Sequence, residues 1–430
     1  MATVVLILAL AVLLAVAWAV GVPIVVTADL ALEAGAVLDT PLVIAANGVT
    51  IDGRGATIHG PGAPDDRESF RGVGVLSEGR RGVTIRNLTV RGFARGLEAR
   101  YGRDWLVEDC DFSDNYDDPS FGWGDGARRG GVVWTGISRS TVRRCRAERV
   151  WNGLDLRRCH ENVVEHNVLA HCSNVCLKLW GSRGNRVADN DLSWGLRIDP
   201  GEVHARDSTG VLIEAGSDGN RFERNDVTHG GDGIFIRSLT GPVSTGNVFL
   251  ENDCSYANNN GFESWSPGNV FRGNRARHCS YGFWLGGSSE TVLEGNDASF
   301  NGRVDGFHNA PVPEFGHAGI VFVYGPGHHS VVDGNRCARN AGAGIAFCGG
   351  LASRGESWRM QDLAIRNNEL FDNEVGLLAW YVDGLCLANN AFEGNARDEW
   401  IESVTGLRRG RAGGQGSPAP PDGPDEKGIA

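Results

Sequence analysis

A short phrase, glycine followed by alternating apolar and variable residues, recurs through the middle of the chain. Copies include GLDLR from Gly153 and GIFIR from Gly233, and in two less regular copies Asn174 and Gly210 serve as the glycine equivalents. The variable positions then hold Asp155, Arg157, Lys178, Glu214, Phe235, Arg237, Glu263, Trp265 and Trp284. Neighbouring carboxylates and cations keep each other ionised, and flat aromatic rings offer apolar faces to sugar rings.

Two of these carboxyl groups suit a glycoside hydrolase, which needs one group as acid and one as base or nucleophile. Glu214 and Glu263 are the leading pair, with Arg237 between them to keep one carboxylate ionised. Asp155 or Asp199 could replace either member. Repeats stacked about 4.8 Å apart would separate the pair by about 9.6 Å along the stack, which favours an inverting mechanism.

The same positions allow two other functions. A lyase or C5-epimerase acting on a uronic acid needs a base and a cation that neutralises the sugar carboxylate. Lys178 suits the base, and Arg157 or Arg237 suits the neutraliser. Neither reaction requires a cofactor, although calcium could bind Glu214 with a loop carboxylate such as Asp199. The third hypothesis is a binding or maturation module that uses the aromatic positions without turnover.

Three long insertions fall at one corner of the repeat and are expected to rise as walls beside these positions. They cover residues 111–130, 191–209 and 297–318. Their side chains add substrate-binding candidates, which are Trp123, Trp194, Asp199 and His308. His204 is a catalytic candidate because its loop belongs to the repeat that carries Glu214. A fourth insertion, after Phe347, falls at a different corner and is not expected to line the same groove.

A second phrase, two apolar-leaning and two variable residues before an asparagine, sets the period of the chain. It runs from VVEHN, ending at Asn167, to CLANN, ending at Asn390, and neighbouring copies are commonly 22 or 23 residues apart. Such a period predicts a solenoid. Stacked coils would bring the asparagine amides together, where they satisfy one another's hydrogen bonds. These asparagines are therefore predicted to be structural.

Two or three short alternating strands per period predict an all-β fold, a single-stranded right-handed parallel β-helix of about 12–14 coils. The repeat resembles the pectate-lyase-like β-helix superfamily. This superfamily includes carbohydrate-binding and sugar-hydrolase repeats and the periplasmic maturation protein of nitrous-oxide reductase. The resemblance covers roughly residues 27–400, and residues 41–62 resemble the first coils of the superfamily. It implies the fold and not the reaction, because such coils serve lyases, hydrolases, epimerases and binding proteins.

The two ends of the chain differ from the repeat. Residues 1–26 are almost entirely apolar and predict a signal peptide or signal anchor, and so a secreted, periplasmic or membrane-anchored protein on the extracytoplasmic side. The β-helix domain is expected over residues 27–405. Residues 406–430, rich in glycine, proline and charge, predict a disordered tail. Membrane contact is expected only through an uncleaved N-terminal segment.

The net charge limits the classes of partner that the sequence allows, and the cysteine pattern bears on disulfide bridges and metal sites. The net charge of −12 argues against nucleic-acid binding and leaves a polysaccharide or oligosaccharide as the expected partner, while the oligomeric state is not set by the sequence. Most of the ten cysteines fall at inward positions and are predicted to be free thiols, with a bridge among Cys159, Cys172 and Cys176 left open. No metal site is predicted, because no cysteine and histidine spacing matches a zinc pattern.

Overall fold

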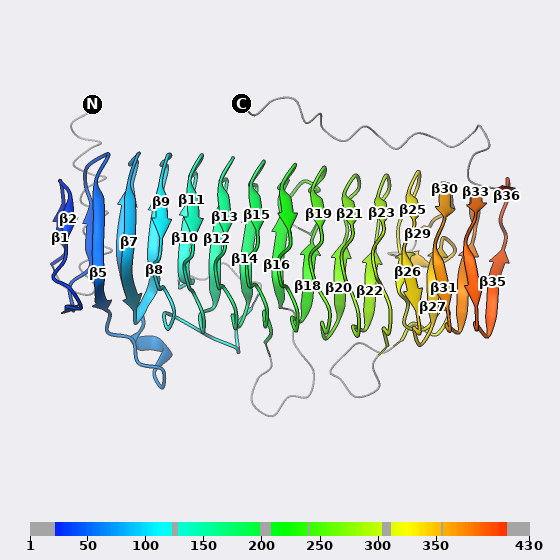
Figure 1. Cartoon of the computed structure of the whole chain (residues 1–430), viewed down its shortest axis with the longest axis horizontal. Coiled ribbons are helices and arrows are strands. Elements are labelled where there is room, and N and C mark those ends of the chain that lie inside the picture. The colour runs from blue at the N-terminus through cyan, green and yellow to red at the C-terminus, as the bar shows by residue number, and fades with distance from the viewer. Residues whose placement is uncertain are drawn as a thin grey trace.

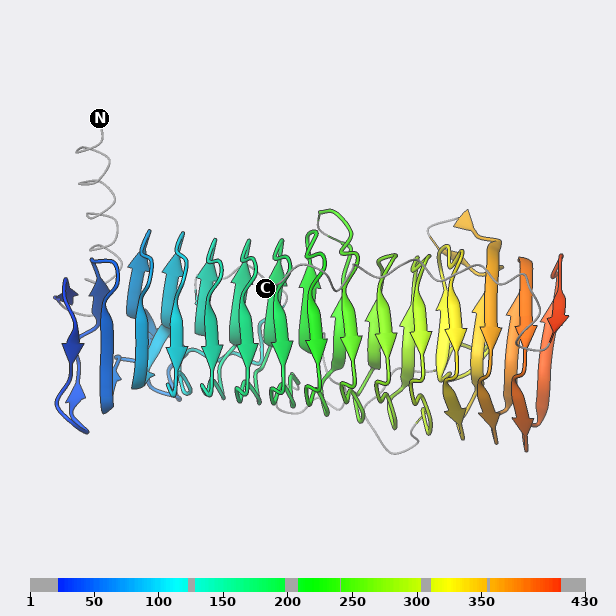
Figure 2. The ribbon, with the colours of Figure 1, turned by 45° about the horizontal axis from the view of Figure 1, so that its top comes forward.

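Two long sheets of parallel strands run side by side along the whole molecule (Figure 1). The computed structural model describes residues 22–122, 128–197, 208–239, 241–302, 311–353 and 356–410. Each coil passes through one strand of each sheet, and successive coils stack along one axis, as Figure 2 shows from a second direction. The described chain is a parallel β-helix, and this confirms the solenoid predicted from the repeat.

The first sheet has 15 strands. Along the axis they are β1 (Ile24–Val26), β4 (Leu42–Ile44), β6 (Arg71–Glu78), β8 (Phe93–Arg100), β10 (Gly130–Thr135), β12 (Asn152–Arg157), β14 (Val175–Trp180), β16 (Thr209–Glu214), β18 (Asp232–Ile236), β20 (Asn260–Ser264), β22 (Tyr281–Leu285), β24 (Ile320–Val323), β27 (Ala343–Cys348), β32 (Val375–Trp380) and β35 (Arg397–Glu402). The recurring glycine phrase forms the middle strands of this sheet.

The second sheet has 16 strands. They are β2 (Leu30–Ala31), β5 (Thr50–His59) with β3 (Val37–Leu38) beside it, β7 (Thr84–Arg91), β9 (Leu106–Glu108), β11 (Thr141–Arg143), β13 (Val163–Glu165), β15 (Arg186–Ala188), β17 (Arg221–Glu223), β19 (Val248–Leu250), β21 (Val270–Arg272), β23 (Val292–Glu294), β25 (Val331–Asp333), β30 (Met360–Arg366), β33 (Val382–Ala388) and β36 (Arg408–Gly410). The sequence predicted 12–14 coils. The strands β2, β5 and β36 belong to further coils, which lack the asparagine phrase.

Smaller elements complete the coils. A three-stranded sheet forms from β26 (Arg336–Ala338), β31 (Glu369–Phe371) and β34 (Ala391–Glu393). The insertion after Phe347 contains an antiparallel pair, β28 (Ala352–Ser353) and β29 (Glu356–Ser357). A single 3₁₀ turn, η1, covers Arg67–Ser69.

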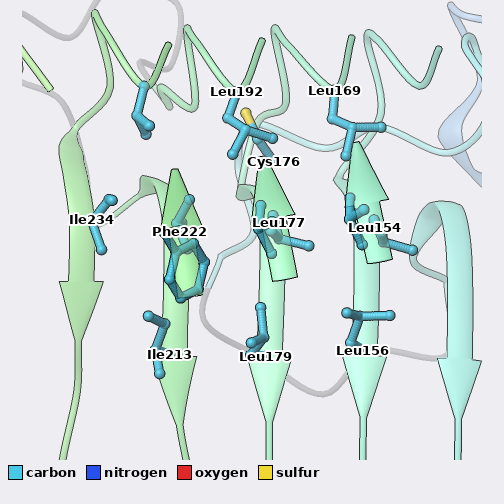
Figure 3. Packing of buried hydrophobic residues seen from close by; sticks show 14 of the residues in the cluster. Leu154, Leu156, Leu169, Cys176, Leu177, Leu179, Leu192, Ile213, Phe222 and Ile234 are labelled. Atoms are coloured by element: carbon cyan, nitrogen blue, oxygen red, sulfur yellow. The ribbon is translucent and has the colours of Figure 1, made fainter. Parts of the chain in front are cut away.

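The core is a stack of equivalent side chains, one set per coil. Leu154 of β12 pairs in register with Leu177 of β14, and both point inward and are buried (Figure 3). The rings of Phe222, Phe249 and Phe271 stack in successive coils, with centroids 5.0 and 4.9 Å apart. Burying each such side chain contributes about 1.5–3 kcal/mol. The strand alternation read from the sequence therefore sets the inside of the helix.

The recurring asparagines form an internal ladder, as predicted. The Asn190 amide donates to Oδ1 of Asn225 at 2.9 Å and to the carbonyl oxygen of Val164 at 2.9 Å, while its backbone N–H donates to the same Oδ1 at 3.1 Å. This pattern links the coils from Asn167 to Asn390. Parallel ladders run from Asn162 to Asn269 and from Asn301 to Asn395. Buried amides thus find partners in the next coil at every turn.

The cysteines and the chain ends test further expectations. All ten cysteines are free thiols, nine of them buried, and no bridge joins Cys159, Cys172 or Cys176. Strand β1 begins at Ile24, inside the segment predicted as a leader, and β36 extends to Gly410, inside the predicted tail, because both pair with a neighbouring coil. No helix among the described residues is long and apolar enough to cross a membrane.

Candidate functional site

The outward face of the first sheet carries two columns of side chains, set by the strand register. The first column is Val133, Asp155, Lys178, Leu212, Phe235, Glu263 and Trp284. The second is Thr135, Arg157, Trp180 and Glu214, continued by Arg237, Trp265 and Gly286, which follow paired residues of β18, β20 and β22. Most of the predicted outward residues therefore do share one face.

The strand register corrects the position that the sequence predicted for Lys178. The prediction took Asn174 as the glycine equivalent and so placed Lys178 beside Arg157, but Lys178 pairs with Asp155. The residue that aligns with Gly153 is Cys176, whose side chain is buried in the core. A shift of two residues keeps Lys178 outward and gives Trp180 the neighbouring place in the second column.

Glu214 is the centre of a buried group of three charges. Its Oε1 accepts a hydrogen bond from Nε of Arg237 at 2.6 Å, and its Oε2 lies 3.3 Å from Nζ of Lys178. The Glu214 side chain is 0% exposed, that of Lys178 is 3% and that of Arg237 is 12%. Two cations compensate the buried carboxylate, so the group is a fixed structural network on this face.

Carboxylates also organise arginines at the N-terminal part of the face. Asp155, which is 0% exposed, accepts from Nη1 of Arg129 at 3.0 Å and from Nε of Arg157 at 3.1 Å. Glu98 accepts from Arg100 at 2.6 Å and pairs with Arg95. Each carboxylate thus holds two guanidinium groups in a defined orientation.

These arginines line a hollow of about 580 Å³, called here the arginine hollow. Its lining residues are Glu78, Arg95, Glu98, Arg100, Tyr101, Arg129, Val133, Thr135, Arg157, Arg158 and Trp180. Its five arginines outnumber its two glutamates together with the buried Asp155 that pairs with two of them, so the wall is locally basic on an acidic chain. The guanidinium groups of Arg157 and the ammonium group of Lys178 lie 6.0 and 5.3 Å from the ring of Trp180.

A second hollow of about 580 Å³ opens further along the same face and is called here the tryptophan hollow. It is lined by Phe235, Arg237, Ser238, Leu239, Glu263, Trp265, Gly286, Gly287, Tyr324, Gly325, Pro326 and Trp358. Trp265 donates from Nε1 to Oε1 of Glu263 at 2.6 Å, and Asn260 donates to Oε2 at 2.6 Å. The Glu263 carboxylate is therefore fixed at the wall.

Trp358 was missed by the sequence prediction. It belongs to the insertion after Phe347, which was expected to lie away from the groove, yet it lines the tryptophan hollow together with Trp265. The insertion follows the C-terminal end of β27, a strand of the first sheet. A tryptophan in a long insertion is the signal that could have found it.

Two predicted binding tryptophans lie elsewhere. Trp284 packs in an apolar cluster on the sheet, with Tyr281 and Tyr324 rings 4.8 and 5.9 Å away, and does not line either hollow. Trp194 lies between His171 and His229, whose rings are stacked on it at 5.7 and 4.5 Å.

Trp194 is part of an aromatic column at one turn of the helix. The column consists of His171, Trp194, His229, Tyr256, His278 and Phe300 in successive coils. From His229 to Phe300, each ring centroid lies 4.5–5.1 Å from the centroid of the preceding ring. All six residues have φ values between 55° and 63°. Stacking offsets the strain of this left-handed conformation, so the column stabilises the turn.

The loops at the N-terminal end pack against one another. Arg67 pairs with Asp118 at 2.8 Å, Glu68 pairs with Arg128, and the Phe121 ring stacks on Trp151 at 5.4 Å. An insertion over residues 60–70, which the sequence prediction did not count among the walls, supplies Arg67 and Glu68. Four candidates, Trp123, Asp199, His204 and His308, lie outside the described residues.

Glu214 and Glu263, the pair expected for a hydrolase, have different surroundings. Glu263 is at the wall of the tryptophan hollow, whereas Glu214 is enclosed by Lys178 and Arg237. The structure does not bring them together as two solvent-facing carboxylates. Among the described residues, no group of three or more His, Cys, Asp or Glu side chains could hold a metal ion. The loop carboxylate Asp199, expected to share a calcium ion with Glu214, lies outside these residues, so that site stays a prediction.

Comparisons with known proteins identify the family. A family model described as periplasmic copper-binding protein (NosD) matches residues 47–268, slightly more than half of the chain. The chain belongs to the NosD family. A second model, described as right handed beta helix region, matches residues 202–396 and confirms the predicted right-handed, pectate-lyase-like fold. Among curated proteins, none matches the chain in sequence.

Solved structures similar to this NosD-family chain share its fold at low identity. The A-module of the Azotobacter vinelandii mannuronan C-5 epimerase AlgE4 is 13% identical with a TM-score of 0.51, covering 92% of this chain and 95% of that chain. The periplasmic alginate epimerase AlgG is 13% identical with a TM-score of 0.48, covering 91% and 86%. DFA-IIIase from Arthrobacter chlorophenolicus A6 is 13% identical with a TM-score of 0.38, covering 87% and 88%.

The description of the NosD family raises the question of copper. Copper prefers thiolate, thioether and imidazole ligands. Burial raises the pKa of Cys159 to about 12 and that of Cys254 well above its usual range, so these thiols stay protonated in the core. The stacked rings of the aromatic column hold their nitrogens in parallel planes, where they do not converge on one ion. These two thiols and the stacked imidazoles therefore do not form a copper site.

Proposed function

We propose that this protein is an extracytoplasmic carbohydrate-active protein whose ligand is an acidic polysaccharide or oligosaccharide, held along the outward face of the first sheet. The observation that carries the proposal is the arginine hollow, where five arginines outnumber three carboxylates, those of Glu78, Glu98 and the buried Asp155, on a chain of net charge −12. A guanidinium group binds a carboxylate through two parallel hydrogen bonds, so the hollow suits the carboxylate of a uronic acid.

The arginine hollow is preorganised for such a group. Asp155 and Glu98 lie against the sheet and orient four of the five arginines, so these side chains lose little freedom when a ligand binds. The fifth, Arg158, is exposed at the wall. The rings of Tyr101 and Trp180 border the cations and give a sugar ring an apolar surface.

The location and the fold support the proposal. The description of the NosD family as periplasmic agrees with the leader expected over residues 1–26. The Azotobacter vinelandii protein with this fold is a mannuronan C-5 epimerase, so the fold can carry chemistry on a polysaccharide. This is an analogy of fold, and the arginine hollow supplies the argument from the site itself.

Proton transfer at C5 of a uronate, by a lyase or an epimerase, is the second candidate. It needs a cation at the sugar carboxylate, which the arginine hollow offers, and a group that exchanges the C5 proton. Lys178 is enclosed with Glu214, so it does not reach this hollow. Tyr101 lines the hollow, is 62% exposed and carries a hydroxyl that could exchange the proton.

Hydrolysis remains a third candidate with a different requirement. Glu263 would act at the tryptophan hollow, and its partner would have to be a carboxyl group other than the enclosed Glu214.

Binding is tested by calorimetric titration with oligogalacturonate and with cello-oligosaccharides of the same length. We expect binding of the acidic ligand only, weakening with added salt. Arg158→Gln removes one cation from the hollow without breaking an ion pair to any residue that the structure describes, and it should weaken binding several-fold. Arg408→Gln, an exposed arginine of the last coil, is the matched control and should change nothing. Equal binding of both sugars, or equal effects of both variants, would overturn the proposal.

Turnover is followed on the same acidic ligands. The ultraviolet absorbance of an unsaturated uronide would mark a lyase, an altered C5 configuration seen by NMR would mark an epimerase, and new reducing ends alone would mark a hydrolase. For the second candidate, Tyr101→Phe should abolish the first two signals while leaving binding intact. If Tyr101→Phe retained full turnover, the assignment of Tyr101 would be rejected.

A further inference from the structure

We propose that the two hollows are subsites for one glycan chain that carries both acidic and uncharged sugars. A uronate occupies the arginine hollow and an uncharged sugar ring occupies the tryptophan hollow. This inference rests on the proposed function and names the class of ligand more closely, a mixed acidic glycan.

Both hollows belong to the same outward face. Arg157 and Trp180 of the arginine hollow and Arg237 and Trp265 of the tryptophan hollow stand in the same column. Only the coil of β16 lies between the two linings, and there Glu214 is covered. A chain running along the helix axis therefore meets both hollows in turn.

The distance between them requires an oligosaccharide. Arg157 lies on β12 and Trp265 directly follows β20, four coils further along the axis. At about 4.8 Å per coil the separation is about 19 Å, well beyond the reach of a single sugar. One ligand that engages both hollows gains affinity over one that engages either alone, because the second contact forms within the same complex.

The chemistry of the tryptophan hollow differs from that of the arginine hollow. It has one arginine, Arg237, against five in the arginine hollow, and the Glu263 carboxylate at its wall would repel a uronate. A carboxylate accepts hydrogen bonds from sugar hydroxyls. Trp265, Tyr324 and Trp358 supply aromatic surface in its lining. An uncharged ring with free hydroxyls is the ligand that satisfies both features.

The position of Trp265 is built into the fold. Its ring lies over Gly286, where an added Cβ would come within 2.5 Å of the indole, so glycine makes room for it. The hydrogen bond to Glu263 fixes the ring from its nitrogen side. The aromatic surface is therefore held ready before a ligand arrives.

The test compares two acidic ligands of equal length by calorimetry. Hyaluronan oligosaccharides alternate a uronate with an uncharged amino sugar, whereas oligogalacturonate contains uronate only. We expect decasaccharides of hyaluronan to bind at least ten-fold more tightly than decasaccharides of galacturonate, and disaccharides of both to bind equally weakly.

Variants separate the two subsites. Trp265→Ala should reduce hyaluronan binding to the level of galacturonate and leave galacturonate binding unchanged. Trp358→Ala, which removes another ring from the lining of the same hollow, should act in the same direction, and its thermal midpoint reports whether the fold is kept. Trp400→Ala, a half-exposed tryptophan of the last coil, is the control and should have no effect.

The outcomes distinguish this inference from the proposed function. If galacturonate binds and Arg158→Gln weakens it, but hyaluronan binds no better or Trp265→Ala weakens both ligands alike, the mixed-glycan inference is wrong and the acidic-glycan function stands. If neither ligand binds, or Arg158→Gln has no effect on either, both are wrong.

Discussion

Arg237 donates a hydrogen bond from Nε to the Glu214 carboxylate at 2.6 Å, and that carboxylate is fully enclosed. Glu214 lies between the two hollows, Arg237 lines the tryptophan hollow, and Lys178 reaches the carboxylate from the preceding coil. Charges enclosed in this way are costly to leave without their partners, so the group is expected to matter more for folding than for ligand contact.

Glu214→Gln is therefore predicted to destabilise the protein strongly. Removing the carboxylate leaves Lys178 and Arg237 as buried cations, and the expected loss is about 3–5 kcal/mol, measured by denaturant unfolding. The matched control is Glu294→Gln, which breaks the exposed pair with Arg272 and should cost about 1 kcal/mol or less. Equal losses in the two variants would show that Glu214 is not held as a buried charge.

The neighbours Asp117 and Asp118 are predicted to respond oppositely to replacement by asparagine. Burial raises the pKa of Asp117. Burial also opposes ionisation of Asp118, but hydrogen bonds from Ser120 and Tyr116 outweigh it and lower the pKa of Asp118. A carboxyl group whose pKa is raised by folding destabilises the folded state when the pH lies above the pKa of the unfolded chain. A carboxyl group whose pKa is lowered by folding stabilises the folded state at the same pH, and this stability is lost as the pH falls.

At neutral pH, Asp117→Asn should thus raise the melting temperature and Asp118→Asn should lower it. Both differences should shrink as the pH falls below about 3, where the unfolded carboxyl groups are protonated as well. Thermal unfolding at neutral and acidic pH checks this. A loss of stability at neutral pH in both variants would contradict the prediction for Asp117.

Alkaline pH is predicted to weaken the fold through two buried tyrosines. Burial raises the pKa of Tyr281 to about 12, and burial with the hydrogen bond to Asp118 raises that of Tyr116 to about 12. The unfolded value is about 10, so the folded state binds more protons between about pH 10 and 12, and stability falls as pH rises through that window. Tyr116→Phe with Tyr281→Phe should flatten the decline relative to the parent protein, and a parallel decline would contradict this.

The asparagine ladder should be most sensitive at its centre. Asn225→Ala removes an amide that donates to Asn252 at 2.8 Å and to the Val187 carbonyl at 3.0 Å, and that accepts from the backbone N–H of Asn190 at 3.1 Å. The buried Val187 carbonyl and Asn190 N–H both lose these bonds. Each such group costs about 1–3 kcal/mol. Asn390→Ala, at the partly exposed end of the ladder, is the control, because water can replace the lost amide there. A similar loss at both positions would argue against the ladder as the source of stability.

The inside of the molecule was determined by the sequence alone. The period of the asparagine phrase predicted the stacked coils, since residues one period apart can only meet if the chain returns to the same place each turn. The alternation around Leu154 and Leu156 predicted which side chains point inward, because neighbouring residues of a strand face opposite sides.

Only the tertiary structure decided the register of an irregular coil and the contacts made by side chains on the outer surface. Cys176 stands where Gly153 stands in the preceding coil, so local pattern matching displaced Lys178 by two residues, and only the strand pairing restored its register. Glu214 is enclosed by side chains of neighbouring coils, and Trp358 lines the tryptophan hollow although it belongs to an insertion. Both features depend on packing between coils. Periodicity fixes a residue's column and face, but what covers it depends on lateral packing between segments far apart in the chain.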